Sequence, residues 1–312
     1  MERNIIVKSL LFAVIVLLAI WSCDRGEGAR ENAAADEESP STYHLELGDE
    51  IPPEELSDTT NVELKDDAPA GSDNPLGKFE YTWTDSDDMP DIVIVVDDFG
   101  SSGALLEDYA KLPSEVVFAV LPDLAHTKRS GEIAAQYNHE VLIHMPMQPE
   151  STSENPGEKY VKTTDSEETI KSLIADFYKQ LPMAIGANNH MGSAATANRE
   201  AMQAVLKNLH SKGMFFLDSA TTAKSVSASI ARTNGYPALK RDVFLDVPDS
   251  KDATLAKKIE SLKNYKGRRE PVIIITHCHN REKLKALQNF IEQIKGMGLR
   301  LTTLSRARQL AV

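Results

Sequence analysis

The most restrictive feature of this chain is an uninterrupted apolar run, 92–96, that ends in two adjacent aspartates. The segment reads Ile92-Val93-Ile94-Val95-Val96-Asp97-Asp98-Phe99-Gly100. A β-branched run of this length is typical of a strand buried on both faces, as in a parallel sheet covered by helices. In such sheets the carboxyl ends of the strands form the ligand-binding edge.

Two neighbouring carboxylates at that edge repel each other unless a cation, a proton or a substrate lies between them. The alternative is that Asp98 or Ser101 only caps the following helix, because Asp and Ser are good N-caps. A cap requires one such residue, so the second acid favours a functional site.

The first 23 residues are typical of an export signal. Arg3 and Lys8 precede an apolar run, 10–21, that is short for a membrane span and suits the core of a signal peptide. The run is followed by Cys23, in a context that resembles the cleavage box of bacterial lipoproteins. We expect residues 1–23 to be a signal peptide, a lipoprotein signal or an uncleaved anchor. The rest is then exported to the periplasm or cell envelope and tethered to the membrane by lipid or by the N-terminal segment.

Residues 24–88 differ in composition from the rest of the chain. They hold 20 acidic and four basic residues, a net charge of −16. The whole chain carries −13 and residues 1–23 carry +1, so residues 89–312 carry +2. Such a segment predicts a disordered acidic linker. The remainder, 89–312, is long enough for one full domain. It shows no basic patch or stacking motif, so we expect no nucleic-acid partner.

Strand-like and helix-like segments alternate from residue 92 onward. The predicted strands are 92–96, 116–121, 140–144, a short one running into 186–193, 214–217, 243–245, 271–276 and 299–301. The predicted helices are 104–112, one through 132–135, 166–180, 199–212, 225–232, 253–265 and 283–295. Pro146 and Pro149 are expected to break the third strand. This alternation predicts a parallel sheet with right-handed crossovers, and seven or eight units favour a closed or nearly closed α/β barrel.

Seven acidic or histidine side chains fall at or just after the ends of these predicted strands: Asp97, Asp98, His144, His190, Asp218, Asp246 and His277. Each has a simpler explanation when taken alone, since a lone histidine is often structural and an aspartate often caps a helix. Strand ends of a barrel converge on one mouth, however, so the seven together predict a site there. One aspartate with two histidines is a common ligand set for zinc or a similar divalent ion.

Several segments carry a resemblance to a known family. They are Val96–Gly100, His139–His144, His144–Met147, Asn188–Ser193, Phe216–Ser219, Arg241–Asp246 and the strand ending in His277. Through them residues 90–310 resemble the polysaccharide deacetylases, the NodB-homology group of metal-dependent carbohydrate esterases. The likeness is stronger to the divergent branch of these enzymes. The resemblance implies a distorted (β/α) barrel of seven or so strands, with 89–312 as the catalytic domain.

The resemblance also implies roles for individual residues. Asp97 would be the base, Asp98 a metal ligand, His144 the first metal-binding histidine and His277 the general acid. The ordinary second motif has another histidine four residues after the first, and here that position is Gln148. We expect His190 to replace it, so that Asp98, His144 and His190 hold the ion, with zinc as the leading candidate.

The implied activity is hydrolysis of acetyl groups on an acetylated polysaccharide or a peptidoglycan-like glycan of the envelope. Asp246 or Asp218 is expected to orient His277, and Arg241 to neutralise one of these acids. Asn189 and Asp218 are expected to contact substrate. Membrane contact is expected only through the N-terminal anchor.

Gln148 motivates an alternative, an exported glycan-binding or scaffold protein that keeps the fold without turnover. A metal hydrolase acting on an amide bond of peptidoglycan is a third hypothesis. An aspartyl-phosphate transferase is disfavoured, because such enzymes require acids two apart after the first strand and position 99 is Phe.

Overall fold

The computed structural model describes residues 62–65, 74–83 and 85–310. The predicted signal segment, 1–23, and most of the predicted linker lie outside the described residues. Within the described ranges, none of the helices combines the length and the apolar character that a membrane span requires.

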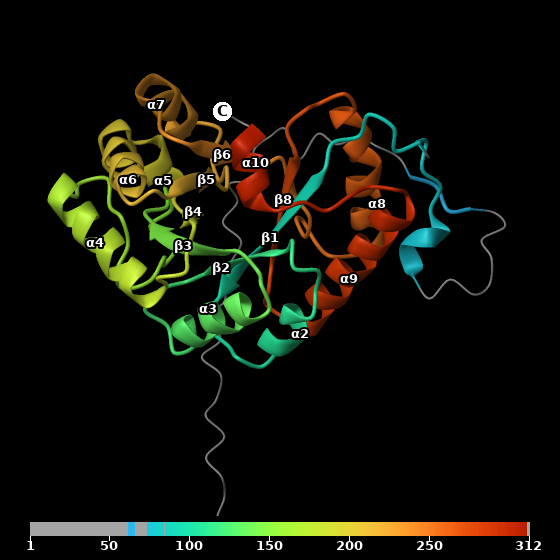
Figure 1. Ribbon diagram of the computed structural model, residues 1–312, viewed down its shortest axis with the longest axis horizontal. Coiled ribbons are helices and arrows are strands. Elements are labelled where there is room, and N and C mark those ends of the chain that lie inside the picture. The colour runs from blue at the N-terminus through green and yellow to red at the C-terminus, as the bar shows by residue number, and fades with distance from the viewer. Residues whose placement is uncertain (1–61, 66–73, 84, 311–312) are drawn as a thin grey trace, which may run out of the picture. The chain divides into compact units, whose positions relative to one another are not determined.

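A parallel sheet organises the described part of the chain, with strand order β6-β5-β4-β3-β2-β1-β8-β7 (Figure 1). Its strands are β1 (Ile92–Phe99), β2 (Val117–Val120), β3 (Val141–Met147), β4 (Gly186–Met191), β5 (Phe215–Asp218), β6 (Ala238–Lys240), β7 (Val243–Phe244) and β8 (Val272–His277). Every paired neighbour runs parallel. The predicted α/β fold is therefore confirmed. Among the described residues the sheet has eight strands and is open between its edge strands, β6 and β7.

The sheet curls into a partial barrel. The Asn188 side chain on β4 donates a hydrogen bond of 2.8 Å to the Asp97 carboxylate on β1, although β3 and β2 lie between these strands. In a flat sheet, positions three strands apart are separated by about 14 Å. Curling therefore brings the carboxyl ends of β1, β3 and β4 to one site.

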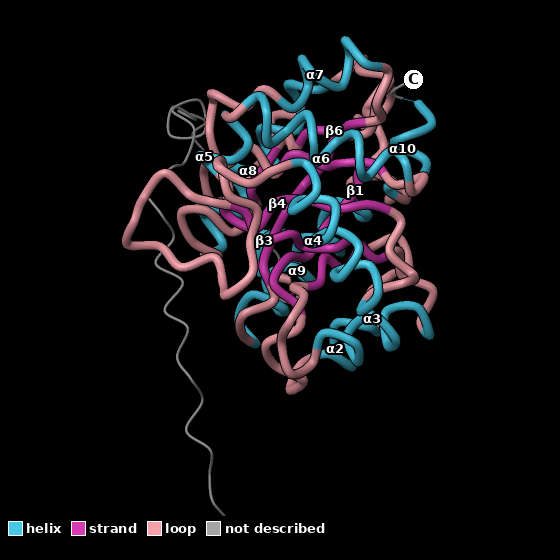
Figure 2. The backbone as a smooth tube through the Cα atoms, turned by 90° about the vertical axis from the view of Figure 1, so that its left-hand side faces the viewer, coloured by secondary structure: helices cyan, strands magenta, loops and turns pink. Residues whose placement is uncertain are grey.

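Helices flank this curled sheet, most of them on its outside (Figures 1 and 2). They are α2 (Leu106–Ala110), α3 (Thr127–Gln136), α4 (Glu167–Gln180), α5 (Ser193–Ala197), α6 (Arg199–Ser211), α7 (Ser227–Asn234), α8 (Asp252–Ser261), α9 (Arg281–Gly296) and α10 (Leu304–Leu310), with 3-10 turns η1 (Pro75–Lys78) and η2 (Leu262–Tyr265). Side-chain caps define several N-termini, since Ser166, Asn198 and Asn280 accept backbone N–H groups of α4, α6 and α9.

The core has an outer and an inner part, and β1 contributes to both. Ile92, Ile94 and Val96 belong to the outer cluster with the surrounding helices. Val93 and Val95 belong to an inner cluster shared with β2, β3, β5, β8 and α10. The continuous apolar run at 92–96 therefore follows from burial on both faces, as predicted.

Helix α10 closes the inner core, and this gives a stability prediction. Leu304 is fully buried in the inner cluster, whereas Leu310 on the same helix is 44 % exposed. Leu304→Ala is expected to lower the free energy of unfolding by about 2–5 kcal/mol, because it removes buried methyl groups and leaves a cavity. Leu310→Ala is the matched control and should change stability by less than about 0.5 kcal/mol. Urea unfolding measures both, and equal effects would contradict the role assigned to α10.

Two expectations about local structure were wrong, and three short elements were not predicted. The predicted strand 299–301 is only a single parallel bridge between Leu301 and Ile92. Strand β3 continues through Pro146. The Pro146 carbonyl accepts a hydrogen bond from Val161, on the side away from β4. Because the N and C=O of a strand residue point to the same side, the N–H that proline lacks would not have bonded to β4. The short elements α5, β6 and α10 were not predicted, since none is long enough to show a clear periodicity.

Part of the predicted linker packs on the domain. In residues 74–83, Leu76 is fully buried, Thr82 bonds through its backbone N–H and its hydroxyl to Glu260, and the Trp83 indole donates to the Ile259 carbonyl. The apolar and aromatic side chains of this segment explain why it packs although its neighbours are acidic. The packed unit thus begins upstream of residue 89.

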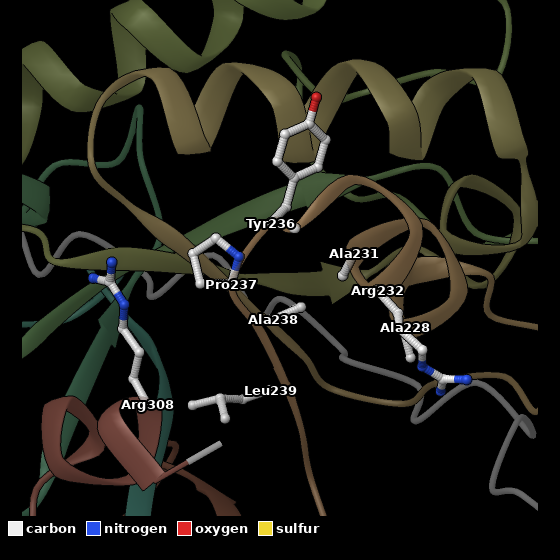
Figure 3. Close-up of a pocket in the computed structure, with 9 residues that line it drawn as sticks. Ala228, Ala231, Arg232, Tyr236, Pro237, Ala238, Leu239 and Arg308 are labelled. Atoms are coloured by element: carbon white, nitrogen blue, oxygen red, sulfur yellow. The ribbon is translucent and has the colours of Figure 1, made fainter. Parts of the chain in front are cut away.

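A cavity of about 400 Å³ lies at the amino ends of β5 and β6 (Figure 3). Its lining residues come from α7, the turn 235–237, β6 and α10, and Arg308 donates to the carbonyl of Gly213 just before β5. None of the described residues that line it is an acid, a histidine or a cysteine. The titratable residues predicted at the strand ends therefore lie elsewhere.

Candidate metal centre

The end of β1 presents both of its aspartates to the same site. A register shift between Val96 and Phe99 marks a bulge in the pairing with β2, and Asp98 has a φ of 71°. A regular strand would direct neighbouring side chains to opposite faces, whereas a bulge redirects one of them. As a result both carboxylates approach one imidazole, with Asp98 Oδ1 at 3.1 Å and Asp97 Oδ2 at 3.8 Å from His144 Nε2.

Gly100 allows the chain to leave the bulge. Its φ is 117°, and a Cβ there would lie 2.8 Å from the carbonyl oxygen of Leu121. Only glycine fits both the backbone conformation and the close approach.

The two histidines reach the site from adjacent strands. The parallel register places His144 of β3 beside Asn188 of β4. His190 lies two residues further along β4 and so projects from the same face as Asn188. Both histidines are buried.

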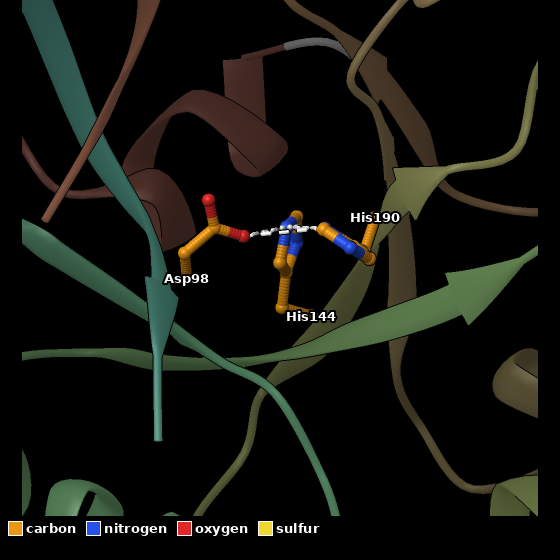
Figure 4. A group of neighbouring side chains, drawn as sticks. All are labelled: Asp98, His144 and His190. Atoms are coloured by element: carbon orange, nitrogen blue, oxygen red, sulfur yellow. Dashed lines mark hydrogen bonds and ion pairs between the residues drawn. The ribbon is translucent and has the colours of Figure 1, made fainter. Parts of the chain in front are cut away.

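Three electron-pair donors meet at the centre of this cluster (Figure 4). Asp98 Oδ1 is 3.1 Å from His144 Nε2 and 3.2 Å from His190 Nδ1, and the two nitrogens are 3.2 Å apart. His144 Nδ1 lies 3.0 Å from the Asn188 side-chain oxygen, which can only accept, so Nε2 carries the lone pair when the ring is neutral. Asp98 Oδ1 is fully buried and has no hydrogen-bond partner. A cation between the three atoms satisfies them all, and one carboxylate with two imidazoles suits zinc.

The electrostatics of the cluster also favour a cation. Burial raises the pKa of Asp98, but the close imidazoles of His144, His190 and His279 outweigh burial and hold it well below the usual range. Burial lowers the pKa of His144, yet the neighbouring Asp97 carboxylate reverses this and raises it. Asp98 is therefore ionised, and its carboxylate provides the negative charge at the point where the three donors meet.

Gln148 takes no part in this donor set. Its side-chain oxygen accepts from the backbone N–H of Thr163 at 2.9 Å and from the Thr163 hydroxyl at 3.1 Å. It thus holds the loop that follows β3, while His190 occupies the third donor position. The structure brings together the three residues that the sequence predicted as ligands.

A second polar group lies at the ends of β7 and β8. His277 Nδ1 is 3.0 Å from Asp246 Oδ2, and Lys283 Nζ donates to the same oxygen at 2.6 Å. Burial alone would lower the pKa of His277, but the Asp246 carboxylate raises it to about 9. Burial raises the pKa of Asp246, but His277 and Lys283 hold it well below the usual range. The β1–β8 register pairs Asp97 with His277, so the two groups face one mouth.

Three predicted residues bond to the segment that follows β5 or to its neighbours. Arg241 donates to the carbonyls of Ser219 and Ala220 and stacks on Phe244, and the cation beside Asp246 is Lys283. Asp218 accepts from Ala220 N–H and from two serine hydroxyls. Asn189 accepts from Ser219 N–H and donates to the Met191 carbonyl. Both Asp218 and Asn189 are at most 2 % exposed. Asp218 and Asn189 thus support the loop after β5.

Asn188, Lys283 and His279 were missed in the sequence analysis. His279 Nε2 is 2.6 Å from Asp98 Oδ2, the oxygen that faces away from the other donors, and its ring lies 5.3 Å from that of His277. The two-residue spacing of Asn188 and His190 within one strand was the available signal for Asn188. The same two-residue spacing relates His279 to His277, whereas Lys283 carried no such signal.

Comparison with known proteins found a matching family model and related bacterial sequences. The family model described as divergent polysaccharide deacetylase matches residues 94–307. The uncharacterized protein YibQ of Escherichia coli K12 is 34 % identical over 189 residues, which are 60 % of this chain and 58 % of YibQ. An uncharacterized protein of Haemophilus influenzae is 35 % identical over 195 residues, 60 % of this chain and 66 % of that protein. The match thus spans less than two thirds of either relative.

A solved structure shares the fold. The uncharacterized protein ATU2773 of Agrobacterium tumefaciens C58 superposes with a TM-score of 0.64 and 22 % identity, covering 79 % of this chain and 99 % of that one. At this identity the likeness concerns the fold alone.

Proposed function

This chain belongs to the divergent polysaccharide deacetylase family, and we propose that it is a metal-dependent hydrolase that removes acetyl groups from an envelope glycan. The observation that carries the proposal is the buried set of three electron-pair donors, Asp98, His144 and His190, whose carboxylate oxygen has no hydrogen-bond partner. A divalent ion held there would supply polarisation of the acetyl carbonyl and a lowered pKa of bound water.

Asp97 is the proposed general base. It is 2 % exposed, Asn188 holds its Oδ1, and its Oδ2 faces His144 Nε2 at 3.8 Å. Burial raises its pKa, while the nearby His144 and His277 oppose the change. A carboxylate with a raised pKa is a stronger base, so Asp97 is suited to accept the proton of the attacking water.

His277 is the proposed general acid. With a pKa of about 9 its ring is protonated at neutral pH, and Asp246 holds Nδ1. The other ring nitrogen of His277, Nε2, then carries the proton that would be donated to the leaving amine or alcohol. Asp246 thus both orients the ring and keeps it charged.

The envelope location is part of the proposal. The predicted export signal at 1–23 and the acidic linker support a domain that works outside the cytoplasm, tethered to the membrane by lipid or by the uncleaved segment. A domain so placed meets acetylated glycans, including peptidoglycan-like strands.

Acetate release tests the activity. The full chain, loaded with zinc, is incubated with N-acetylglucosamine oligomers and, separately, with O-acetylated xylan. Acetate release is expected from at least one of them, to be lost after treatment with a chelator and to return when zinc is added. Tight oligomer binding without acetate from any acetylated glycan would instead support the alternative, a glycan-binding protein. Cleavage of muropeptide amides alone would support the third hypothesis.

The pH dependence of that activity follows from His277. Its protonated form is the active one, so the rate is expected to fall as the pH rises through about 9. Asp246→Asn removes the charge that raises the pKa, so this alkaline limb should move down towards or below about 6.5. Lys283→Met removes a cation that lowers the pKa of His277, so the limb should move slightly upward. The profile of kcat/KM against pH measures both shifts, and an unmoved limb in Asp246→Asn would contradict the assignment.

A further inference from the structure

We infer that Asn188 is a positioning residue whose single buried amide sets both the tautomer of His144 and the orientation of Asp97. The inference rests on the proposed function for the roles of those two residues. Asn188 itself is placed to touch neither ion nor substrate, since its amide is used by three side chains of the protein.

The orientation of the amide follows from its neighbours. Asn188 is fully buried, with its Nδ2 2.8 Å from Asp97 Oδ1 and 3.3 Å from the Ser219 hydroxyl. An ionised carboxylate only accepts hydrogen bonds, so the NH2 end must face Asp97. The oxygen end therefore faces His144 Nδ1 at 3.0 Å.

This orientation selects one tautomer of His144. The amide oxygen accepts the Nδ1 proton, which leaves the lone pair of the neutral ring on Nε2, facing Asp98 Oδ1 and His190 Nδ1. In the other tautomer, two lone pairs would face each other at Nδ1, and an N–H would occupy the donor position. Outer partners of ligating histidines act in this way in metal sites.

The other end of the amide directs Asp97. Its donation to Oδ1 leaves Oδ2 as the oxygen that faces His144 Nε2 at 3.8 Å. The side-chain amide of asparagine accepts hydrogen bonds at its oxygen and donates them from its nitrogen. Replacements that keep only one of these properties therefore separate the two effects.

Two variants separate them. Asn188→Asp keeps an acceptor for His144 but places an oxygen against Asp97. It is expected to keep zinc affinity within about tenfold of the parent, while kcat falls by about 10–100-fold. Asn188→Leu has a similar volume and neither property, so both zinc affinity and kcat should fall by about 10–100-fold. Competition with a chromophoric chelator measures zinc affinity, and acetate release at saturating zinc measures kcat.

Asn189→Leu is the matched control. Asn189 is the next residue of β4, is equally buried and also has both ends of its amide bonded, but to the backbone of Ser219 and Met191. Its replacement should lower the melting temperature about as much as Asn188→Leu and leave zinc affinity within about threefold of the parent. Equal loss of zinc affinity in both leucine variants would show a general distortion of β4 and overturn the inference.

A third measurement needs neither zinc nor turnover. ¹⁵N NMR of the metal-free chain, at a pH high enough to leave His144 neutral, reports which ring nitrogen carries the proton. We expect Nδ1–H in the parent and in Asn188→Asp, and loss of this preference in Asn188→Leu.

The outcomes distinguish the inference from the proposed function. An Nε2–H ring in the parent, or a folded Asn188→Leu chain with parental zinc affinity, overturns the inference whether or not acetate is released. A chain that shows the expected tautomers and zinc affinities but hydrolyses no acetylated glycan overturns the proposed function and leaves the tautomer assignment standing.

Discussion

His190→Ala is expected to lose zinc binding and activity, whereas Gln148→Ala keeps both. His190 Nδ1 lies 3.2 Å from both other donor atoms of the site. Removing a direct ligand should lower zinc affinity by more than the 10–100-fold typical of outer partners, so we expect a loss above about 100-fold. Gln148 is the position where the wider family carries its second histidine, but here its side chain holds Thr163.

Zinc per chain, measured by elemental analysis after dialysis, checks this result. The parent and Gln148→Ala should retain about one ion per chain, and His190→Ala little or none. Melting temperature serves as the control for folding. If Gln148→Ala loses the metal and His190→Ala keeps it, the donor set proposed for this chain is wrong.

Asp97→Asn is expected to lower kcat by about 10²–10⁴-fold while zinc affinity stays close to the parental value. The change removes the basic carboxylate but keeps its shape, and the amide oxygen at position 97 can still accept the hydrogen bond from Asn188. Asp98 and the two histidines keep their positions, so metal binding should survive.

Acetate release at saturating zinc measures the effect, and zinc titration of the same samples is the control. Asp98→Asn provides the contrast, because it changes the buried oxygen of the donor set and should weaken zinc binding as well. Parental turnover in Asp97→Asn would remove Asp97 from the mechanism.

Most of the fold could be predicted from local patterns. The apolar runs at 92–96 and 271–276 indicated strands buried on both faces, and the alternation with amphipathic helices indicated a parallel α/β sheet. The failures were short or irregular elements. Strand β3 passes through Pro146, whose carbonyl accepts a hydrogen bond from the Val161 N–H. This contact spans a loop, so no local sequence pattern indicates it.

The candidate site could likewise be predicted only in part. The strand-end positions of Asp98, His144, His190 and His277 were visible in the sequence, because strand ends converge on one edge of a parallel sheet. Apart from Asp246, which was expected to orient His277, the residues that support them were not visible. Lys283 reaches Asp246 from α9, and His279 reaches Asp98 from the far end of the chain.

The sequence by itself determined the strand–helix alternation and which reactive side chains end the strands, since both follow from local hydrophobic patterns. Only the tertiary structure decided how those side chains are used. The bulge at Asp98 turns both acids of β1 to one side, and the curl of the sheet brings Asn188 within 2.8 Å of Asp97. Bulges and sheet curvature arise from packing between distant segments, so no short stretch of residues encodes them.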